Sequence, residues 1–189
     1  MLAAGGSKRM GEPKQLLKFQ GKTLVRRAVE AVVDAGCASV VVVVGNAAQA
    51  VEDELKDLRI QVAMNEQWQR GIGSSLRTGA ELVLKLKPAL DAIMIMLCDQ
   101  PRVDAQTIRR LIDAHETSGK SVCISAFAGT MGPPVIVGSQ FFAALQGLPD
   151  SSGAKAIWAA HPDQVLQVPA EEAAFDIDTP QDYAALSGG

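Results

Sequence analysis

The sequence has few histidines and cysteines, and this scarcity excludes several kinds of catalytic and metal site. Among its 189 residues are two histidines and three cysteines. Nothing in their order suggests a Ser-His-Asp or Cys-His nucleophile, and no cluster has the ligand spacing of a structural zinc site. Cys37, Cys98 and Cys123 form no close pair and lie in or beside apolar segments, where a thiol acts as a small hydrophobe. We therefore expect free thiols in a reducing cytoplasm.

Long apolar runs and an excess of positive charge are missing as well. The longest apolar runs, 40–44 and 92–98, are far shorter than the roughly 20 residues of a membrane span. No basic and then apolar leader opens the chain, so nothing in it supports secretion. Net charge is −3, and Lys and Arg are scattered except near the amino terminus. We expect neither a membrane nor a nucleic acid as a partner, and a cytoplasmic location.

The composition is that of an ordinary globular protein. Hydrophobic residues make up 48% and charged residues 21% of the chain, close to the averages for folded domains. A chain of this length is expected to form a single domain over residues 1–189. No internal repeat or linker divides it.

Apolar runs of strand length alternate with segments of helical period, which predicts an α/β fold with a mainly parallel sheet covered by helices. Thr23 and Asp104 are expected to cap helices, and Gly36 and Gly119 to follow helix ends. The order Thr179, Pro180 and Asp182 is typical of the start of a terminal helix. Helices are expected at about 23–35, 47–58, 76–84, 104–119, 139–145 and 153–160, and strands at 39–44, 60–64, 91–97, 122–127, 135–137 (an edge), 165–168 and 175–177.

The chain opens abruptly on the end of an apparent buried strand. Residues 1–4 lead directly to a glycine turn, although a strand normally has about 5–6 residues. We expect the first strand to be truncated, with residues missing before Met1.

The strongest chemical signal is the segment 2–14, with the sequence LAAGGSKRMGEPK. Glycines after a strand let backbone N–H groups approach phosphate oxygens, and Arg9 and Lys14 supply positive charge. The spacing of a Walker A loop fails, because Glu12 and Pro13 stand where the Lys and the hydroxyl would be, and G-x-G-x-x-G is also absent. The segment predicts a phosphate-binding loop; the alternative is a flexible, basic surface loop.

This string resembles the signature L-A-A-G-x-S-x-R-M-G-x-x-K of the molybdopterin guanylyl- and cytidylyltransferase family. Four further stretches resemble the same family in order: 65–79, 98–101 (CDQP), 132–135 (GPPV) and 176–180 (DIDTP). The resemblance spans nearly the whole chain. It implies a Rossmann-like three-layer nucleotidyltransferase fold that uses Mg²⁺ to transfer CMP, or GMP, from an NTP to molybdopterin, with release of pyrophosphate. CTP is favoured over GTP.

The resemblance also implies roles for particular residues. Lys14, Arg9 and Asp99 would act on the triphosphate and the metal, and Asp99 with Asp178 would bind Mg²⁺. The nucleotide would lie against Leu2, Ala3, Ala4, Gly5, Gly6, Ser7, Asn65, Gly73 and Ser74. Phosphoryl-type transfer needs alignment and charge neutralisation more than a protein nucleophile, which suits this set.

Structural roles compete at several of these positions. Asp99 follows an apolar strand, where α/β proteins bind ligands, but it could instead cap a turn before Pro101. Asp176 and Asp178 share one face of an extended segment, and Asp178 could instead cap the last helix. Trp68 is expected to pack rather than to stack on the base.

The chain departs from the family pattern on the acceptor side. Gly132-Pro133-Pro134 replaces Gly-His-Pro, and Lys155 replaces an arginine. Lysine lacks the bidentate fork of arginine, so an anionic pterin phosphate would be held differently. Two other functions stay open: a nucleotidyltransferase for a sugar phosphate or other small phosphate, and a non-catalytic maturation factor for a molybdenum hydroxylase.

Overall fold

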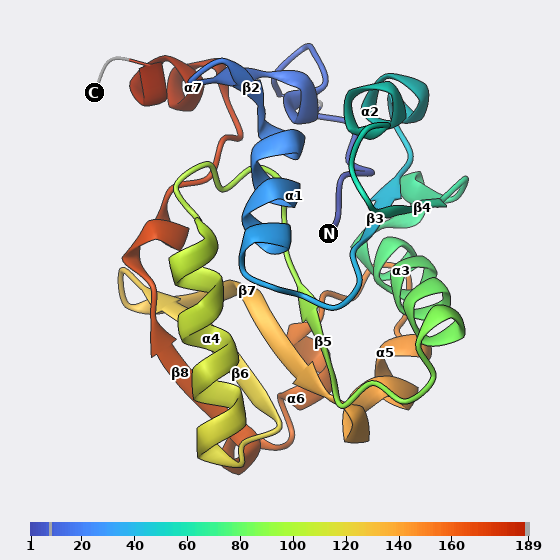
Figure 1. Cartoon of the computed structure of the whole chain (residues 1–189), viewed down its shortest axis with the longest axis vertical. Coiled ribbons are helices and arrows are strands. Elements are labelled where there is room, and N and C mark those ends of the chain that lie inside the picture. Colours follow the sequence, from blue (N-terminus) through green and yellow to red (C-terminus); the bar gives the residue numbers. More distant parts are fainter. Residues whose placement is uncertain (8, 188–189) are drawn as a thin grey trace.

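The apolar runs form the strands of a central sheet in the computed structural model, which describes residues 1–7 and 9–187 (Figure 1). Lys8, part of the expected phosphate loop, lies outside the described residues. Val122–Phe127 forms a strand with the bounds expected, whereas the runs at 39–44 and 91–97 form shorter strands. The strands are β3 (Val41–Val44), β4 (Gln61–Met64), β5 (Ala92–Ile95), β6 (Val122–Phe127), β7 (Thr130–Gly138) and β8 (Val165–Pro169), with a separate hairpin of β1 (Lys18–Phe19) and β2 (Lys22–Thr23).

Residues 1–4 lie between β3 and β5 and join two parts of the sheet. Leu2 forms parallel bridges with Val43 on one side and Leu97 on the other. Its N–H donates to the Met96 carbonyl at 2.8 Å, and the Ala3 N–H donates to the Val43 carbonyl at 2.9 Å. The strand order is therefore β4-β3-(1–4)-β5-β7-β6-β8, and β7 alone runs antiparallel to its neighbours. The carboxyl ends of residues 1–4 and β5 meet at one edge, where such folds bind ligands.

β7 is central, so the expectation of an edge strand at 135–137 is wrong. It pairs with β5 and with β6, and its two prolines, Pro133 and Pro134, fall in a bulge. The pairing with β6 passes from Ile124↔Val135 directly to Ser125↔Gly132. Because the bulge leaves both prolines out of the ladder, their missing N–H groups cost no hydrogen bond.

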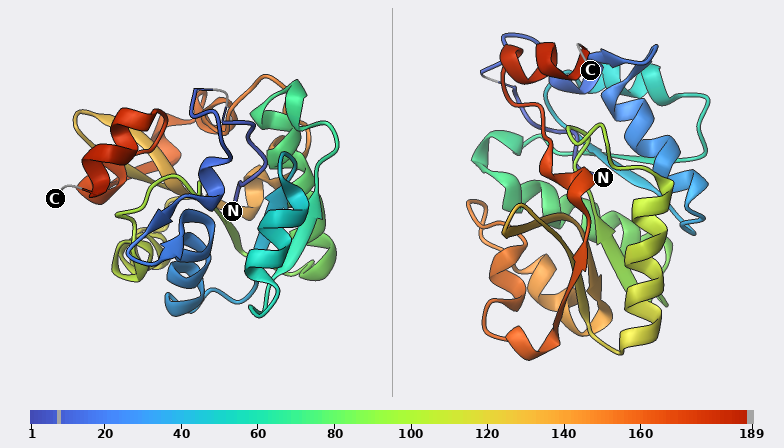
Figure 2. Two further views of the ribbon diagram at one scale, coloured as in Figure 1. Left: turned by 90° about the horizontal axis from the view of Figure 1, so that it is seen from above. Right: turned by 90° about the vertical axis from the view of Figure 1, so that its left-hand side faces the viewer.

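Helices cover both faces of the sheet, giving the three layers visible in Figures 1 and 2. One face packs against α1 (Leu24–Asp34), α2 (Ala48–Leu55) and α4 (Ala105–Ser118). The other packs against α3 (Ile72–Leu86), α5 (Phe142–Gln146) and α6 (Lys155–Trp158). The central valines of β3 alternate between the two layers, which is why the run carries no polar positions. Short 3₁₀ helices are η1 (Lys14–Leu16), η2 (Trp68–Arg70), η3 (Ser139–Phe141), η4 (Pro162–Gln164) and η5 (Glu171–Ala174).

Helix ends follow the expected capping chemistry. The Thr23 hydroxyl accepts from the Arg26 N–H at 3.3 Å, and the Asp104 carboxylate accepts from the Thr107 N–H at 2.8 Å. Gly36 and Gly119 follow α1 and α4 with φ of 88° and 68°, in the region that glycine enters without strain. Both start signals and both stop signals are confirmed.

The segment before the last helix is extended but unpaired, so the strand expected at 175–177 is wrong. The Ile177 N–H donates to the Asp99 carbonyl at 2.9 Å, and within residues 1–7 and 9–187 the segment joins no strand ladder. The last helix, α7 (Pro180–Ser187), lies beside the β1–β2 hairpin in Figures 1 and 2. Packing of Leu17 and Leu24 on Ile177 and Leu186 holds the two chain ends together. Within the described residues, no helix has the length and apolar character needed to cross a membrane.

Candidate active site

The loop that follows residues 1–4 is closed by its own hydrogen bonds. The Ser7 hydroxyl accepts from the Lys14 N–H at 3.0 Å. Gln15, which is 1% exposed, donates through its side-chain amide to the carbonyls of Ala3 at 2.9 Å and Gly5 at 2.7 Å. These bonds fold the segment back on itself and hold Lys14 at the carboxyl end of the sheet. Sequence reasoning missed Gln15, because nothing in its surroundings signals that its amide is buried.

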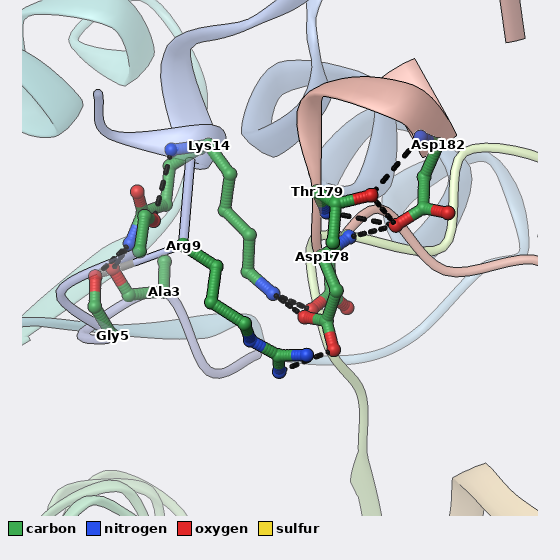
Figure 3. Close-up of polar contacts among 10 residues, drawn as sticks. Ala3, Gly5, Arg9, Lys14, Asp178, Thr179 and Asp182 are labelled. Carbon is green, nitrogen blue, oxygen red and sulfur yellow. Dashed lines mark hydrogen bonds and ion pairs between the residues drawn. The ribbon is translucent and has the colours of Figure 1, made fainter. Parts of the chain in front are cut away.

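Lys14 joins two carboxylates that are far away in the sequence. Its ammonium donates to Asp99 Oδ2, 85 residues away, and to Asp178 Oδ1 at 3.0 Å, 164 residues away. Arg9 Nη2 donates to the other oxygen, Asp178 Oδ2, at 2.7 Å. Figure 3 shows both cations directed at Asp178 from the loop. The structure therefore brings together the four charged residues that the sequence singles out.

The charges in this cluster shift one another's protonation. Burial alone would lower the pKa of Lys14, but Asp99 and Asp178 outweigh it and the net shift is upward. The hydrogen bond from Lys14, with the charge of Arg9, lowers the pKa of Asp178 despite partial burial. Burial and the nearby charges of Asp178 and Asp99 raise the pKa of Asp176. At neutral pH, Lys14 and Asp178 are thus both held in their charged forms.

A capping box at the start of α7 positions Asp178. Asp182 Oδ2 accepts from the N–H groups of Asp178 at 3.1 Å and Thr179 at 2.7 Å, and the Thr179 hydroxyl accepts in return from the Asp182 N–H at 3.3 Å (Figure 3). Thr179 is therefore the cap, and the Asp178 carboxylate is free for Lys14 and Arg9. The acid three residues after Thr179 is a signal that sequence reading detects.

A cavity of about 550 Å³ opens beside the cluster, large enough for a nucleotide. Lys14 and Asp99 lie at its wall together with the first residues of the phosphate loop. The remaining wall comes from residues 97–99, which follow β5, and from the segment 68–75. Its lining residues are Leu2, Ala3, Ala4, Gly5, Gly6, Lys14, Gln15, Trp68, Gln69, Gly71, Ile72, Ser75, Leu97, Cys98 and Asp99.

Trp68 packs against the phosphate loop, as expected. A Cβ on Gly6 would lie 2.7 Å from the indole ring, and so would a Cβ on Gly45. Both positions must be glycine for the ring to lie where it does. Trp68 thus sets the distance between the phosphate loop and the segment 68–75, while one part of it lines the cavity.

Four predicted nucleotide contacts, Ser7, Asn65, Gly73 and Ser74, are not among the residues that line the cavity. Asn65, 4% exposed, donates to the hydroxyls of Ser74 and Ser75, both at 2.9 Å, and accepts from the Gln67 N–H. Ser74 donates to the Gly71 carbonyl at 2.8 Å. In this structure these side chains shape the loop, and Ser75, which the resemblance also places in the loop around the base and ribose, reaches the cavity.

A second loop, which includes residues 148–150 and leads into the acceptor-side motif expected at 150–155, packs against this wall. Gly73 donates its N–H to the Asp150 carbonyl at 2.8 Å, and a Cβ at Gly73 would lie 1.9 Å from the Pro149 carbonyl oxygen. Arg77 binds the Asp150 carboxylate and the Leu148 carbonyl, and Arg70 binds Asp150 at 2.6 Å. Gly73 is therefore needed for the close approach of segment 148–150, which sequence spacing does not reveal.

The chemistry of the cluster fits Mg²⁺. Asp99 Oδ1 is buried and has no hydrogen-bond partner among residues 1–7 and 9–187. Mg²⁺ is commonly held by one or two carboxylates together with substrate phosphates and water. In the described residues no group of three or more His, Cys, Asp or Glu side chains is arranged to hold a metal. Burial, together with the nearby charge of Asp99, raises the pKa of the adjacent Cys98 thiol to about 12, so the thiol is protonated at neutral pH.

A glycine loop and a buried carboxylate thus line one nucleotide-sized cavity at the carboxyl end of the sheet, an arrangement that suits a nucleotidyltransferase. The family model of the MobA-like NTP transferase domain matches residues 1–165. The chain belongs to this family, and the resemblance stated from the motifs is confirmed.

Relatives with known names or structures agree on the fold. Nicotine blue oxidoreductase of Paenarthrobacter nicotinovorans is 34% identical over 72% of this chain, which spans 64% of that relative's length. Rv0371c of Mycobacterium tuberculosis is 30% identical, with a TM-score of 0.82 over 100% of this chain and 95% of its own. A manganese complex of the same protein also matches, at 28% identity and with a TM-score of 0.75 over 98% of this chain and 94% of its own. A nucleotidyl transferase from Methanothermobacter is 27% identical, with a TM-score of 0.82 over 98% of this chain and 93% of its own.

Proposed function

We propose that the protein transfers CMP, or alternatively GMP, from an NTP to a molybdopterin-type phosphate in the presence of Mg²⁺. The observation that carries the proposal is the convergence of Lys14, Asp99 and Asp178 on one point beside the nucleotide-sized cavity. These residues come from three of the motifs shared with the family. Family membership supports the nucleotidyltransferase class, and the base and the acceptor are the proposed part.

The reaction needs little covalent chemistry from the protein. An oxygen of the acceptor phosphate forms a bond to the α-phosphorus of the NTP, and the bond from that phosphorus to the pyrophosphate oxygen breaks. Negative charge builds up on the leaving pyrophosphate, so correctly placed cations lower the barrier. Lys14 and Arg9 are the cations that the loop directs toward Asp178 (Figure 3), and Lys14 also lines the cavity.

Asp99 and Asp178 would hold the metal. A bound Mg²⁺ supplies charge neutralisation and alignment for the triphosphate. Asp99 offers the buried, unpartnered Oδ1, and the capping box holds the backbone of Asp178 in place. The mycobacterial relative known as a manganese complex supports a divalent ion in this fold.

The backbone of the phosphate loop would receive the triphosphate. Gly5 has open space around its Cα, and Ser7 and Gln15 fix the loop from behind. Ser75, Gln69 and Trp68 line the wall where base and ribose would lie. Asn65, Gly73 and Ser74 would act by holding that wall in shape.

The test is pyrophosphate release with CTP and GTP run in parallel, each with Mg²⁺ and molybdopterin. We expect turnover that requires the acceptor and is faster with CTP, and we expect Asp99→Asn to abolish it without lowering the folded fraction by circular dichroism. Wild-type turnover in Asp99→Asn would refute the metal role of Asp99. Equal rates with a sugar phosphate in place of molybdopterin would refute the proposed acceptor.

A protein that binds CTP and molybdopterin but releases no pyrophosphate would act as a maturation factor for a molybdenum hydroxylase, and the catalytic proposal would be wrong. Equilibrium dialysis of both ligands alongside the turnover assay separates these outcomes. Transfer with GTP only would reverse the expected base preference and leave the reaction class unchanged.

A further inference from the structure

Lys14 occupies the place between two carboxylates that a metal ion would need. Its ammonium bonds one oxygen of Asp99 and one of Asp178, and its side chain is only 16% exposed. The Asp99 side chain is 11% exposed. An ammonium and a divalent cation repel each other at such distances, and at Asp178 they compete for the same oxygen, Oδ1, because Arg9 holds Oδ2.

We propose that Lys14 is an internal counter-ion, which holds the two carboxylates in the nucleotide-free protein and leaves them when a metal ion binds. The inference rests on the proposed metal role of Asp99 and Asp178. Without a cation, three carboxylates at positions 99, 176 and 178 would lie close together, two of them with only partial access to water. Lys14, together with Arg9 on Asp178, offsets part of this negative charge until the metal replaces Lys14.

This exchange couples the metal to the nucleotide. Once displaced, the ammonium needs a new anionic partner, and the triphosphate in the adjoining cavity is one that a lysine on this loop would meet. Metal alone must therefore bind weakly, whereas metal together with a triphosphate binds well. Arg9 reaches the other oxygen of Asp178 and is more exposed, at 69%, so it can stay in place during the exchange.

The first test measures Mn²⁺ alone, by electron paramagnetic resonance titration of the nucleotide-free protein. We expect Lys14→Met to bind Mn²⁺ more tightly than wild type, on the order of 10- to 100-fold, the range of a typical coupling between two ligands. Lys14→Arg, which keeps the charge, should not gain affinity. Lys18→Met, at an exposed position on β1, is the matched control and should equal wild type. Adding Asp99→Asn to Lys14→Met should remove the gain.

The second test uses the unaltered protein, so it does not depend on how well Lys14→Met folds. Acylation of Lys14 by an amine-reactive reagent, followed by mass spectrometry, should be slow without metal and at least about fivefold faster with saturating Mg²⁺, the lower end of such couplings. Acylation of Lys18 should not change.

Equal or weaker Mn²⁺ affinity in Lys14→Met, or an unchanged acylation rate at Lys14, overturns the inference. Neither measurement uses an NTP or an acceptor. Pyrophosphate release with an unmoved Lys14 would therefore refute this inference alone. Metal-driven release of Lys14 without turnover would refute the proposed reaction alone.

Discussion

Gly73→Ala tests whether the loop 148–150 must pack closely against the cavity wall formed by segment 68–75. The new Cβ would lie 1.9 Å from the Pro149 carbonyl oxygen and 2.9 Å from that of Asp150, both of them backbone atoms. Segment 148–150 must therefore retreat, and the bond from the Gly73 N–H to Asp150 is lost. Gly153→Ala is the matched control in the same loop, because no atom lies within 4 Å of its added Cβ.

The cost follows from these contacts. Overpacking of this kind costs about 1–3 kcal/mol, and a lost hydrogen bond adds about 1 kcal/mol. A total of about 2–4 kcal/mol lowers the melting temperature of a domain of this size by about 4–16 °C. Gly153→Ala should stay within about 1 kcal/mol of wild type.

Thermal unfolding followed by circular dichroism measures both variants under one set of conditions. If Gly73→Ala melts within about 2 °C of Gly153→Ala, on the same scaling, the loop can retreat at no cost. The lock between the two segments would then be a passive contact, and the reasoning would be wrong.

Three further predictions concern the phosphate loop and the capping box. Lys14→Ala should slow pyrophosphate release by about 10²–10³-fold, the usual cost of a lost electrostatic contact to the reacting group. Lys18→Ala should not slow it. Equal, mild effects of the two substitutions would mean that the loop is only a solvated basic surface. Gly6→Ala should lower the melting temperature by several degrees, because the new Cβ meets the rigid indole ring of Trp68. Gly5→Ala, whose new Cβ lies in open space, should not lower it. Equal melting temperatures of the two variants would contradict the packing role of that ring. Hydrogen bonds from a hydroxyl and two backbone N–H groups lower the pKa of Asp182 below its ordinary 3.8, so its contribution to stability is present above about pH 4 and is lost as the pH falls through the lowered pKa. Asp182→Asn should therefore flatten the fall in melting temperature between about pH 5 and 2, and an unchanged slope would show that the carboxylate is not held.

The sequence by itself determined the ends of several helices and the positions of the buried strands. The caps at Thr23 and Asp104, the glycines after α1 and α4, and the capping box of α7 depend on neighbouring residues, so their signals survive without knowledge of the fold. The buried strands at 41–44 and 122–127 were also readable, because both faces of a parallel strand are covered and the run is apolar throughout. The motifs were sufficient to name the family and to select Lys14 and the two carboxylates.

Contacts between distant segments were decided by the tertiary structure. The central place of β7 depends on a bulge that removes Pro133 and Pro134 from the ladder, and its pairing with β6 lies outside any local pattern. The extended segment at 175–177 has strand-like residues but pairs with no strand among the described residues, and its Ile177 N–H bonds the Asp99 carbonyl instead. Ser75 lines the cavity, whereas Asn65 bonds to side chains of the loop behind it. Which of these positions a polar residue takes depends on how segment 65–75 packs against Asp150 and its neighbours. Sequence motifs identify which side chains carry charge. Lys14 meets Asp99, 85 residues away, and Asp178, 164 residues away, only because the sheet forms and because the segment with Leu17 and Leu24 packs against the segment with Ile177 and Leu186.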